Sequence, residues 1–246
     1  MTIFFSALAV YSLVHIIFWF IDNKHTDSIT ESIIEDVIED EIVIDPKTKK
    51  EVKVKKVNVN KLKIKNEDSK GWLEVKGTNI NYPFVQAKDN KYYLTHSYDK
   101  KSSTAGWVFL DYRNDINNLD KNTIIYGHAR LDGTMFGTLK KTINSSWYNN
   151  KNNHIIKVTT DKYEYEFQTF SNYHIKTENY YIQTKFSSDD EFLNFVNKLK
   201  KRSVHNYKVN ITKDDYILTL STCYQENKKI VLHAKLISKK EKTKKE

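Results

Sequence analysis

The first 21 residues contain no charged side chain, and this run limits what the chain can fold into more than its other features do. Residues 1–21 are dominated by Ile, Phe, Leu, Val, Ala and Trp. As a helix they would span about 31 Å, against a bilayer hydrocarbon core of about 30 Å. The run is longer than the apolar part of a signal peptide, and no small-residue cleavage site follows Trp19-Phe20-Ile21. It therefore predicts an uncleaved membrane anchor at residues 1–21.

The charge pattern says less about function. The α-amino group precedes the apolar run and Lys24 is the only nearby basic side chain after it, so charge does not define the orientation of the anchor. The net charge of +9 is spread along 246 residues, with one dense lysine run in a tail at residues 239–246. No nucleic-acid recognition motif accompanies this charge, so no nucleic-acid partner is expected. Attraction to an anionic envelope and a merely solvated lysine surface both remain open.

Residues 22–70 form a segment of their own between the anchor and the rest of the chain. Apolar residues at helical spacing among Glu and Asp predict an acidic amphipathic helix over residues 28–42. Valines alternate with lysines over residues 47–65, which suggests a strand within a lysine-rich linker, but this stretch is left unassigned. Pro46 separates the two parts.

From residue 71 onward, short apolar segments are separated by turns rich in Gly, Asn, Asp and Lys, which predicts a mainly β domain over residues 71–238. Eight such strands suit a closed barrel. The expected strands are residues 72–75, 80–85, 107–110, 123–126, 154–159, 163–169, 216–220 and 230–237. Two helices are expected among them, a short one at 135–139 and a longer one at 188–203 that opens with the capping box Ser188-x-x-Glu191.

Cys223 is the only cysteine of the chain, so it cannot close an intramolecular disulfide. It follows the apolar strand at residues 217–220 and is a buried apolar residue, half of an intermolecular bridge, or a reactive thiol. Another apolar strand, about a hundred residues earlier, ends in Tyr126-Gly127-His128. Spacing alone does not choose a partner for the thiol among eight histidines; His233 lies within a strand and is expected to be a hydrogen-bonded structural residue.

Six blocks between residues 71 and 237 occur in the order found in one enzyme family. They are Gly71-Trp72-Leu73, Gly77-Thr78-Asn79-Ile80-Asn81-Tyr82-Pro83-Phe84-Val85-Gln86, Asp89-Asn90-Lys91-Tyr92-Tyr93-Leu94, Gly106-Trp107-Val108-Phe109-Leu110-Asp111-Tyr112-Arg113-Asn114, Tyr126-Gly127-His128 with Met135-Phe136-Gly137-Thr138-Leu139, and Thr219-Leu220-Ser221-Thr222-Cys223. With these blocks the chain resembles a class B sortase. The resemblance implies a sortase-type closed eight-stranded barrel, no cofactor, and a catalytic domain held outside the cytoplasm by a single membrane pass.

The resemblance also implies a reaction. Cys223 would attack the threonine carbonyl of a sorting signal of the Asn-Pro-x-Thr type in secreted proteins and form a thioester. His128 would transfer protons, and a peptidoglycan precursor amine or a pilin-like lysine would resolve the thioester. Among other enzymes, a papain-like peptidase would place its cysteine before the histidine and at the start of a helix, which this chain does not.

One position departs from the family. Class B sortases carry an arginine at the start of the strand after the cysteine, where this chain has Lys229. Lysine keeps the charge but lacks the planar fork that could hold substrate and oxyanion together. Lys229 could act in its place, or another donor such as Lys228, Arg130 or a backbone N–H could do so. A third possibility is a degenerate sortase retained as an envelope binding module.

Three residues are candidates for substrate binding. Ser221 lies two residues before Cys223 on the same strand, and a hydrogen bond to the backbone explains it equally well. Tyr181 and Ile182 lie just before the helix that would wall the substrate groove, although packing in the core is the simpler explanation for either. No metal site is expected, since the sequence has no Cys/His cluster at zinc spacing and no EF-hand loop.

Overall fold

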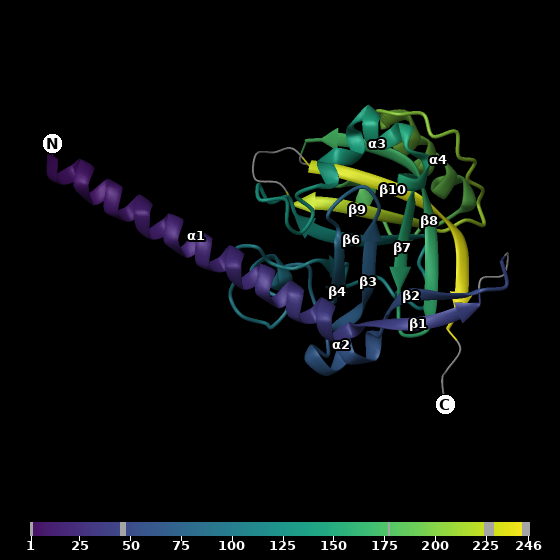
Figure 1. The fold of residues 1–246 in the computed structure, drawn as a ribbon. Coiled ribbons are helices and arrows are strands. Elements are labelled where there is room, and N and C mark those ends of the chain that lie inside the picture. Colours follow the sequence, from purple (N-terminus) through teal and green to yellow (C-terminus); the bar gives the residue numbers. More distant parts are fainter. Residues whose placement is uncertain (1, 45–47, 177, 224–228, 243–246) are drawn as a thin grey trace.

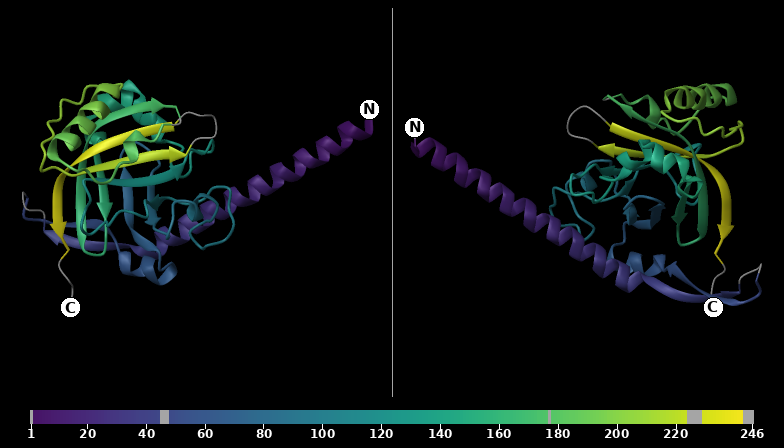
Figure 2. Two further views of the ribbon diagram at one scale, coloured as in Figure 1. Left: turned by 180° about the vertical axis from the view of Figure 1, so that it is seen from behind. Right: turned by 45° about the horizontal axis from the view of Figure 1, so that its top comes forward.

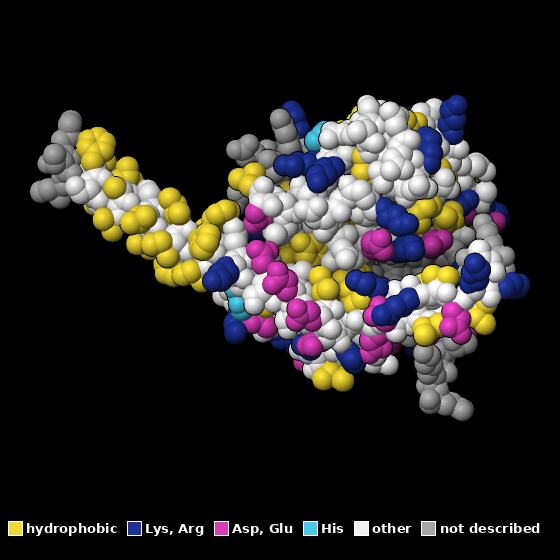
Figure 3. Space-filling model, in the orientation of Figure 1, with side chains coloured by type: hydrophobic (Ala, Val, Ile, Leu, Met, Phe, Trp, Pro, Cys, Tyr) yellow, Lys and Arg dark blue, Asp and Glu magenta, His cyan; other side chains and the backbone are white. Residues whose placement is uncertain are grey.

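The computed structural model describes residues 2–44, 48–176, 178–223 and 229–242, with the backbone alone for residues 2, 3 and 223. Helix α1 (Thr2–Val37) leads into a closed β-barrel from which its first half projects (Figure 1). Within the described part, α1 is the helix long and apolar enough to cross a membrane. Its apolar side chains from Phe4 to Ile21 are exposed, and they cover the projecting segment in Figure 3.

The acidic helix expected at residues 28–42 is only partly correct. Residues 28–37 continue α1 without a break from the apolar run, but the chain then enters strand β1 (Ile38–Ile44), which pairs antiparallel with β2 (Glu51–Val57). Lys53 reaches Asp40 at 2.8 Å and Lys56 reaches Glu41 at 2.5 Å across this hairpin. The unassigned lysine-rich stretch thus supplies a strand and then helix α2 (Val59–Lys65), which Asn58 caps.

The predicted eight-stranded closed barrel is confirmed. Its strands are β3 (Ser69–Val75), β4 (Asn81–Val85), β5 (Phe109–Leu110), β6 (Asn122–His128), β7 (Ile155–Thr159), β8 (Tyr163–Ile175), β9 (Ile217–Cys223) and β10 (Lys229–Glu241). They close in the order β10-β8-β7-β3-β4-β5-β6-β9. Two neighbouring pairs are parallel, β4 with β5 and β6 with β9, and the other pairs are antiparallel. A parallel pair needs a long crossover, which between β6 and β9 contains β7, β8 and all the remaining helical segments except the turn at Tyr92–Leu94.

Two apolar layers hold the fold together. One fills the barrel, where β3, β6, β9 and β10 contribute fully buried residues such as Leu73, Ile125 and Leu220. The other lies between the outer face of β8, β9 and β10 and helix α4 (Asp189–Arg202), which covers that face (Figure 2). Here the sequence prediction is confirmed, because Ser188 caps α4 and its hydroxyl accepts the N–H of Glu191 at 3.1 Å.

Short helical turns complete the connections. They are η1 (Tyr92–Leu94), η2 (Leu139–Ile143), α3 (Ser145–Asn149), η3 (Lys151–His154) and η4 (Tyr180–Ile182). The helix expected at residues 135–139 is wrong, because Met135 forms a bridge with Ala129 and the first helical turn starts only at Leu139. The loop after His128 therefore folds back on itself, and the N–H of Phe136 donates to the carbonyl of His128 at 2.9 Å.

Candidate active site

Strands β6 and β9 lie side by side and end together. Their parallel ladder pairs Asn122 with Ile217 and runs without a shift to the pair His128 and Cys223. Adjacent strands are about 4.8 Å apart, so the backbones of these two residues are direct neighbours. Both strands end on the side of the barrel from which the first half of α1 projects (Figure 1). The fold therefore joins the only cysteine to one particular histidine of the eight.

The imidazole of His128 is held from its far nitrogen. Nε2 lies 2.7 Å from the carbonyl oxygen of Leu94. A carbonyl oxygen can only accept, so Nε2 carries the proton and donates it. In the neutral ring, Nδ1 is then the nitrogen with a free lone pair. The side chain is half-buried, which leaves it accessible to a reacting group.

Gly106 packs directly against this histidine. Its φ of +57° lies in the left-handed region that favours glycine. A Cβ added there would lie 2.5 Å from the carbonyl oxygen of Tyr93 and 3.0 Å from Cδ2 of His128. The N–H of Trp107 also donates to the Tyr93 carbonyl at 2.9 Å. The segment with Tyr93 and Leu94 and the segment with Gly106 and Trp107 are thus in close contact with each other and with the ring of His128.

Comparison with known proteins agrees with this geometry. The profile of the Sortase domain family matches residues 73–237. The chain belongs to the sortase family. It is 39% identical to Sortase B of Listeria monocytogenes over 183 residues, which cover 71% of this chain and 72% of that protein.

Solved class B structures are similar over most of the chain. A Bacillus anthracis sortase B structure superposes with a TM-score of 0.75 at 33% identity, covering 89% of this chain and 99% of the other. A structure described as a Staphylococcus aureus sortase B-substrate complex has a TM-score of 0.69 at 38% identity. The match covers 73% of this chain and 84% of the other chain. The chain is thus a sortase related to class B, a cysteine transpeptidase of a membrane-associated family.

Lys229 begins β10 on the other side of β9. The antiparallel ladder between these strands pairs Val231 with Ser221, and the N–H of Ile230 donates to the hydroxyl of Thr222 at 2.9 Å. This ladder ends at the pair Val231 and Ser221, so Lys229 and Cys223 each lie two residues beyond its last pair. Lys229 is half-buried, and its role at the oxyanion stays a prediction.

Ser221 and Tyr181 contact each other. Their hydroxyl oxygens are 2.9 Å apart, and the side chains are 1% and 0% exposed. Ile182 is half-buried and lies beside Tyr181 in η4. The three candidate substrate-binding residues are therefore close together, with Ser221 and Tyr181 behind the surface and their hydroxyls already hydrogen-bonded. Their role in binding substrate stays a prediction.

Sequence reasoning missed how the segment with Tyr181 and Ile182 is fixed. Arg113 donates from Nη2 to the carbonyl of Ile182 at 3.0 Å and binds both carboxylate oxygens of Asp111 at 2.8 and 2.7 Å. Asp111 is fully buried, which opposes its ionisation, but bonds from Arg113 and from the hydroxyl of Tyr126 lower its pKa below the usual value. Asn122 adds bonds to the carbonyls of Tyr181 at 3.1 Å and of residue 183 at 2.8 Å. The sequence signal for this ion pair was the spacing of two residues between Asp111 and Arg113.

His233 has the structural role expected from the sequence. It is fully buried, its Nδ1 lies 2.9 Å from the hydroxyl of Thr219, and its Nε2 lies 3.0 Å from that of Tyr173. Burial lowers the pKa of His233 to about 3. The ring therefore stays neutral and acts as a hydrogen-bonding link between β8, β9 and β10.

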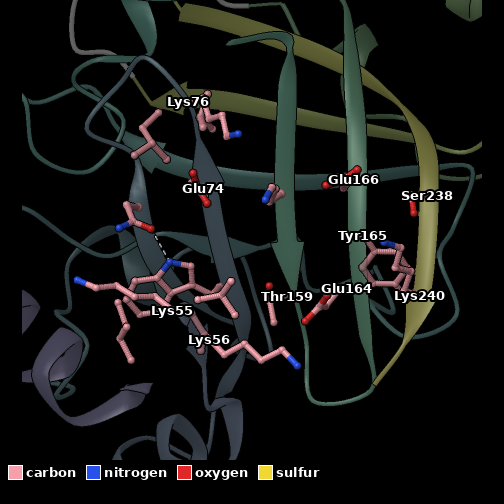
Figure 4. Close-up of a pocket in the computed structure, with 18 of the residues that line it drawn as sticks. Lys55, Lys56, Glu74, Lys76, Thr159, Glu164, Tyr165, Glu166, Ser238 and Lys240 are labelled. Carbon is pink, nitrogen blue, oxygen red and sulfur yellow. Dashed lines mark hydrogen bonds between the residues drawn. The ribbon is translucent and has the colours of Figure 1, made fainter. Parts of the chain in front are cut away.

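A wide cavity lies elsewhere on the barrel. It measures about 630 Å³ and opens between the β1–β2 hairpin and the outer face of β3, β7, β8 and β10 (Figure 4). Lysines and glutamates such as Lys56, Lys76, Glu74 and Glu164 line it, but His128 does not. In the ranges that the structure describes, no group of three or more His, Cys, Asp or Glu residues is arranged to hold a metal ion.

Proposed function

We propose that this sortase cleaves a C-terminal sorting signal of secreted proteins through a thioester on Cys223 and joins them to an amine of the cell wall. The observation that carries the proposal is the pairing of His128 with Cys223 at the common end of β6 and β9. A thiol needs a nearby base or cation to react as thiolate near neutral pH, because its free pKa is about 8.5.

In the first half-reaction, the thiolate of Cys223 attacks the carbonyl carbon of the scissile peptide bond. A tetrahedral oxyanion forms, the C–N bond breaks, and the departing amine takes a proton from the imidazolium of His128. The Nε2 proton of His128 is engaged with Leu94 at 2.7 Å, so Nδ1 is the nitrogen that serves the reaction. The product is a thioester, and the C-terminal part of the signal leaves.

In the second half-reaction, an acceptor amine attacks the thioester carbonyl. Neutral His128 takes the proton that the amine loses, the C–S bond breaks, and the thiolate returns. Lys229 stabilises the oxyanion in both halves, with a single charge in place of an arginine fork. Signals of the Asn-Pro-x-Thr type are the proposed substrates, and a peptidoglycan precursor is the proposed source of the amine.

The proposed location combines the apolar helix α1 with membership of the sortase family, because α1 alone does not define the orientation. Residues 1–21 cross the membrane once, and the barrel lies outside the cytoplasm, where secreted proteins and wall precursors are found. Protease treatment of intact cells tests this. The protease should digest the barrel in cells whose membrane is intact. A barrel that is protected from the protease would show that it lies on the cytoplasmic side.

The decisive experiment is cleavage of quenched fluorescent peptides by the full chain in detergent micelles. Peptides of the Asn-Pro-x-Thr type should be cleaved, and a thioester-linked species should appear on mass spectrometry. Cys223→Ala and His128→Ala should both abolish cleavage. A Cys223→Ala protein that still formed product would refute the mechanism, whereas binding without cleavage by every variant would support the envelope binding module.

Lys229→Arg tests the departure from the family. The planar guanidinium offers two parallel donors, so kcat should rise, by about five-fold if one further hydrogen bond of about 1 kcal/mol forms in the transition state. Lys240→Arg, an exposed lysine of the same strand, is the matched control and should change nothing. Equal activity of the Lys229→Arg variant and the unmodified chain would remove Lys229 from the oxyanion site.

A further inference from the structure

Helix α1 binds the barrel at the point where its uncharged run ends. Asp22 is the first charged side chain of the helix, and its Oδ2 accepts bonds from the N–H of Thr104 at 3.0 Å and of Ala105 at 3.2 Å. The hydroxyl of Thr104 donates to the same oxygen at 2.5 Å. On the next residue, the side-chain carbonyl of Asn23 accepts a bond from Nη2 of Arg130. One turn of α1 is thus bonded to two separate loops.

Both loops border His128. Gly106 follows Ala105 directly, and a Cβ added to it would lie 3.0 Å from Cδ2 of the imidazole and 2.9 Å from the Leu94 carbonyl that holds Nε2. The other loop leaves β6 at His128 itself, and Arg130 is only two residues further on. The contacts of α1 therefore act on the two segments that fix where the ring lies.

The second contact is firmly built. The side chain of Arg130 is 9% exposed and forms an ion pair with Asp132 at 3.0 Å. Asp132 in turn accepts bonds from the N–H and the hydroxyl of Thr134 at 2.9 and 2.7 Å. Arg130 therefore links Asn23 of the helix to the whole turn that follows His128.

The arrangement of the helix gives these contacts a direction. The exposed apolar half of α1 extends from the side of the barrel where β6 and β9 end, and Asp22 lies where that half meets the barrel (Figures 1 and 2). A helix with about 20 apolar residues in a bilayer has little freedom to shift along its axis. Loops bonded to its first polar turn are then fixed relative to the membrane.

We propose that Asp22 and Asn23 are positioning residues for His128, so that the membrane anchor is part of the support of the active site. The bonds of Asp22 hold the 104–106 turn against the imidazole, and the bond of Asn23 holds the loop that follows it. This proposal rests on the proposed function in one respect, that His128 is the residue that transfers protons. A helix that served only as a tether would require neither side chain.

The test uses the full chain in detergent micelles, with Asp22→Ala as the main variant. Glu31→Ala is the matched control, because it removes one negative charge from an exposed position of the same helix. Asp22→Asn keeps one acceptor oxygen and should retain part of the activity that Asp22→Ala loses. Thr104→Val removes a single donor from the opposite partner and should change activity in the same direction but less, which covers the case in which Asp22→Ala does not fold.

Two readouts separate positioning from folding. Peptide cleavage by Asp22→Ala should show a kcat lowered about ten-fold with KM within about two-fold, since a small displacement of a catalytic group lowers the rate without loss of binding. Alkylation of Cys223 by iodoacetamide against pH should shift toward the profile of His128→Ala, because the imidazole sets the ionisation of the thiol. Glu31→Ala should match the unmodified chain in both.

The alkylation profile also keeps this proposal apart from the proposed function. If the unmodified chain cleaved no peptide, the proposed function would fail, yet a profile of Asp22→Ala displaced toward that of His128→Ala would still support positioning. If Asp22→Ala and Thr104→Val matched the unmodified chain in alkylation and in kcat, the anchor would be a tether and the inference would be overturned.

Discussion

Gly106→Ala is the substitution for which the structure gives the sharpest prediction. The φ of +57° costs a residue with a Cβ about 1–2 kcal/mol, and the added methyl would lie 2.5 Å from the Tyr93 carbonyl and 3.0 Å from the His128 ring. Relief of that overlap adds about 1–3 kcal/mol, so the free energy of unfolding should fall by about 2–5 kcal/mol. Because the backbone carbonyl cannot move easily, the ring should shift, and a displacement of about 1 Å lowers the rate about 100-fold.

Gly77→Ala separates the loss of activity from the loss of stability. Gly77, in the turn between β3 and β4, also has a positive φ, +73°, but the atoms nearest to an added Cβ are side-chain atoms of Asn153 at 2.8 Å and not atoms of His128. Thermal unfolding and peptide cleavage are measured for both variants. Both should unfold at lower temperature, and only Gly106→Ala should lose cleavage. If the two variants had similar activities at equal folded fraction, Gly106 would not set the position of His128.

Two further predictions concern buried polar groups. The pKa of His233 is about 3 in the folded chain and about 6.5 in the unfolded one. Between these values the unfolded chain binds a proton that the folded chain does not. The free energy of unfolding should therefore fall by about 1 kcal/mol per pH unit as the pH drops below 6.5. Denaturant titrations at pH 7, 6 and 5 check this against His233→Gln, which should show a smaller slope; equal slopes would contradict it. Arg113→Lys should cost about 2 kcal/mol in the same titrations and raise KM, because lysine cannot bind Asp111 and the Ile182 carbonyl together; an unchanged KM would show that this link does not support the substrate groove.

The fold could be predicted for the barrel because its strands are short, apolar and well separated, while the β1–β2 hairpin shows the limit of local patterns. Residues 28–42 have the spacing of a helix, yet Ile38 and Ile42 also suit a strand. What decides is a partner about fifteen residues further on, where lysines such as Lys53 face acidic residues such as Asp40. The opposite charges of the two segments were visible in the sequence, but the pairing that joins them was not.

The candidate site shows the same division between residue identity and spatial arrangement. Cys223 could be named because it is the only cysteine, but His128 was chosen among eight histidines only because Tyr126-Gly127-His128 resembles the motif of class B sortases. That the strands of these two residues are parallel neighbours in the same register depends on the crossover of nearly ninety residues between them, which no local pattern describes. The contact between Asp22 and Thr104, 82 residues apart, is still harder to predict, because a lone Asp after an apolar run indicates only the polar end of an anchor. Such contacts leave no periodic pattern in the sequence. Residues that support a site from another element are therefore the hardest to predict from sequence.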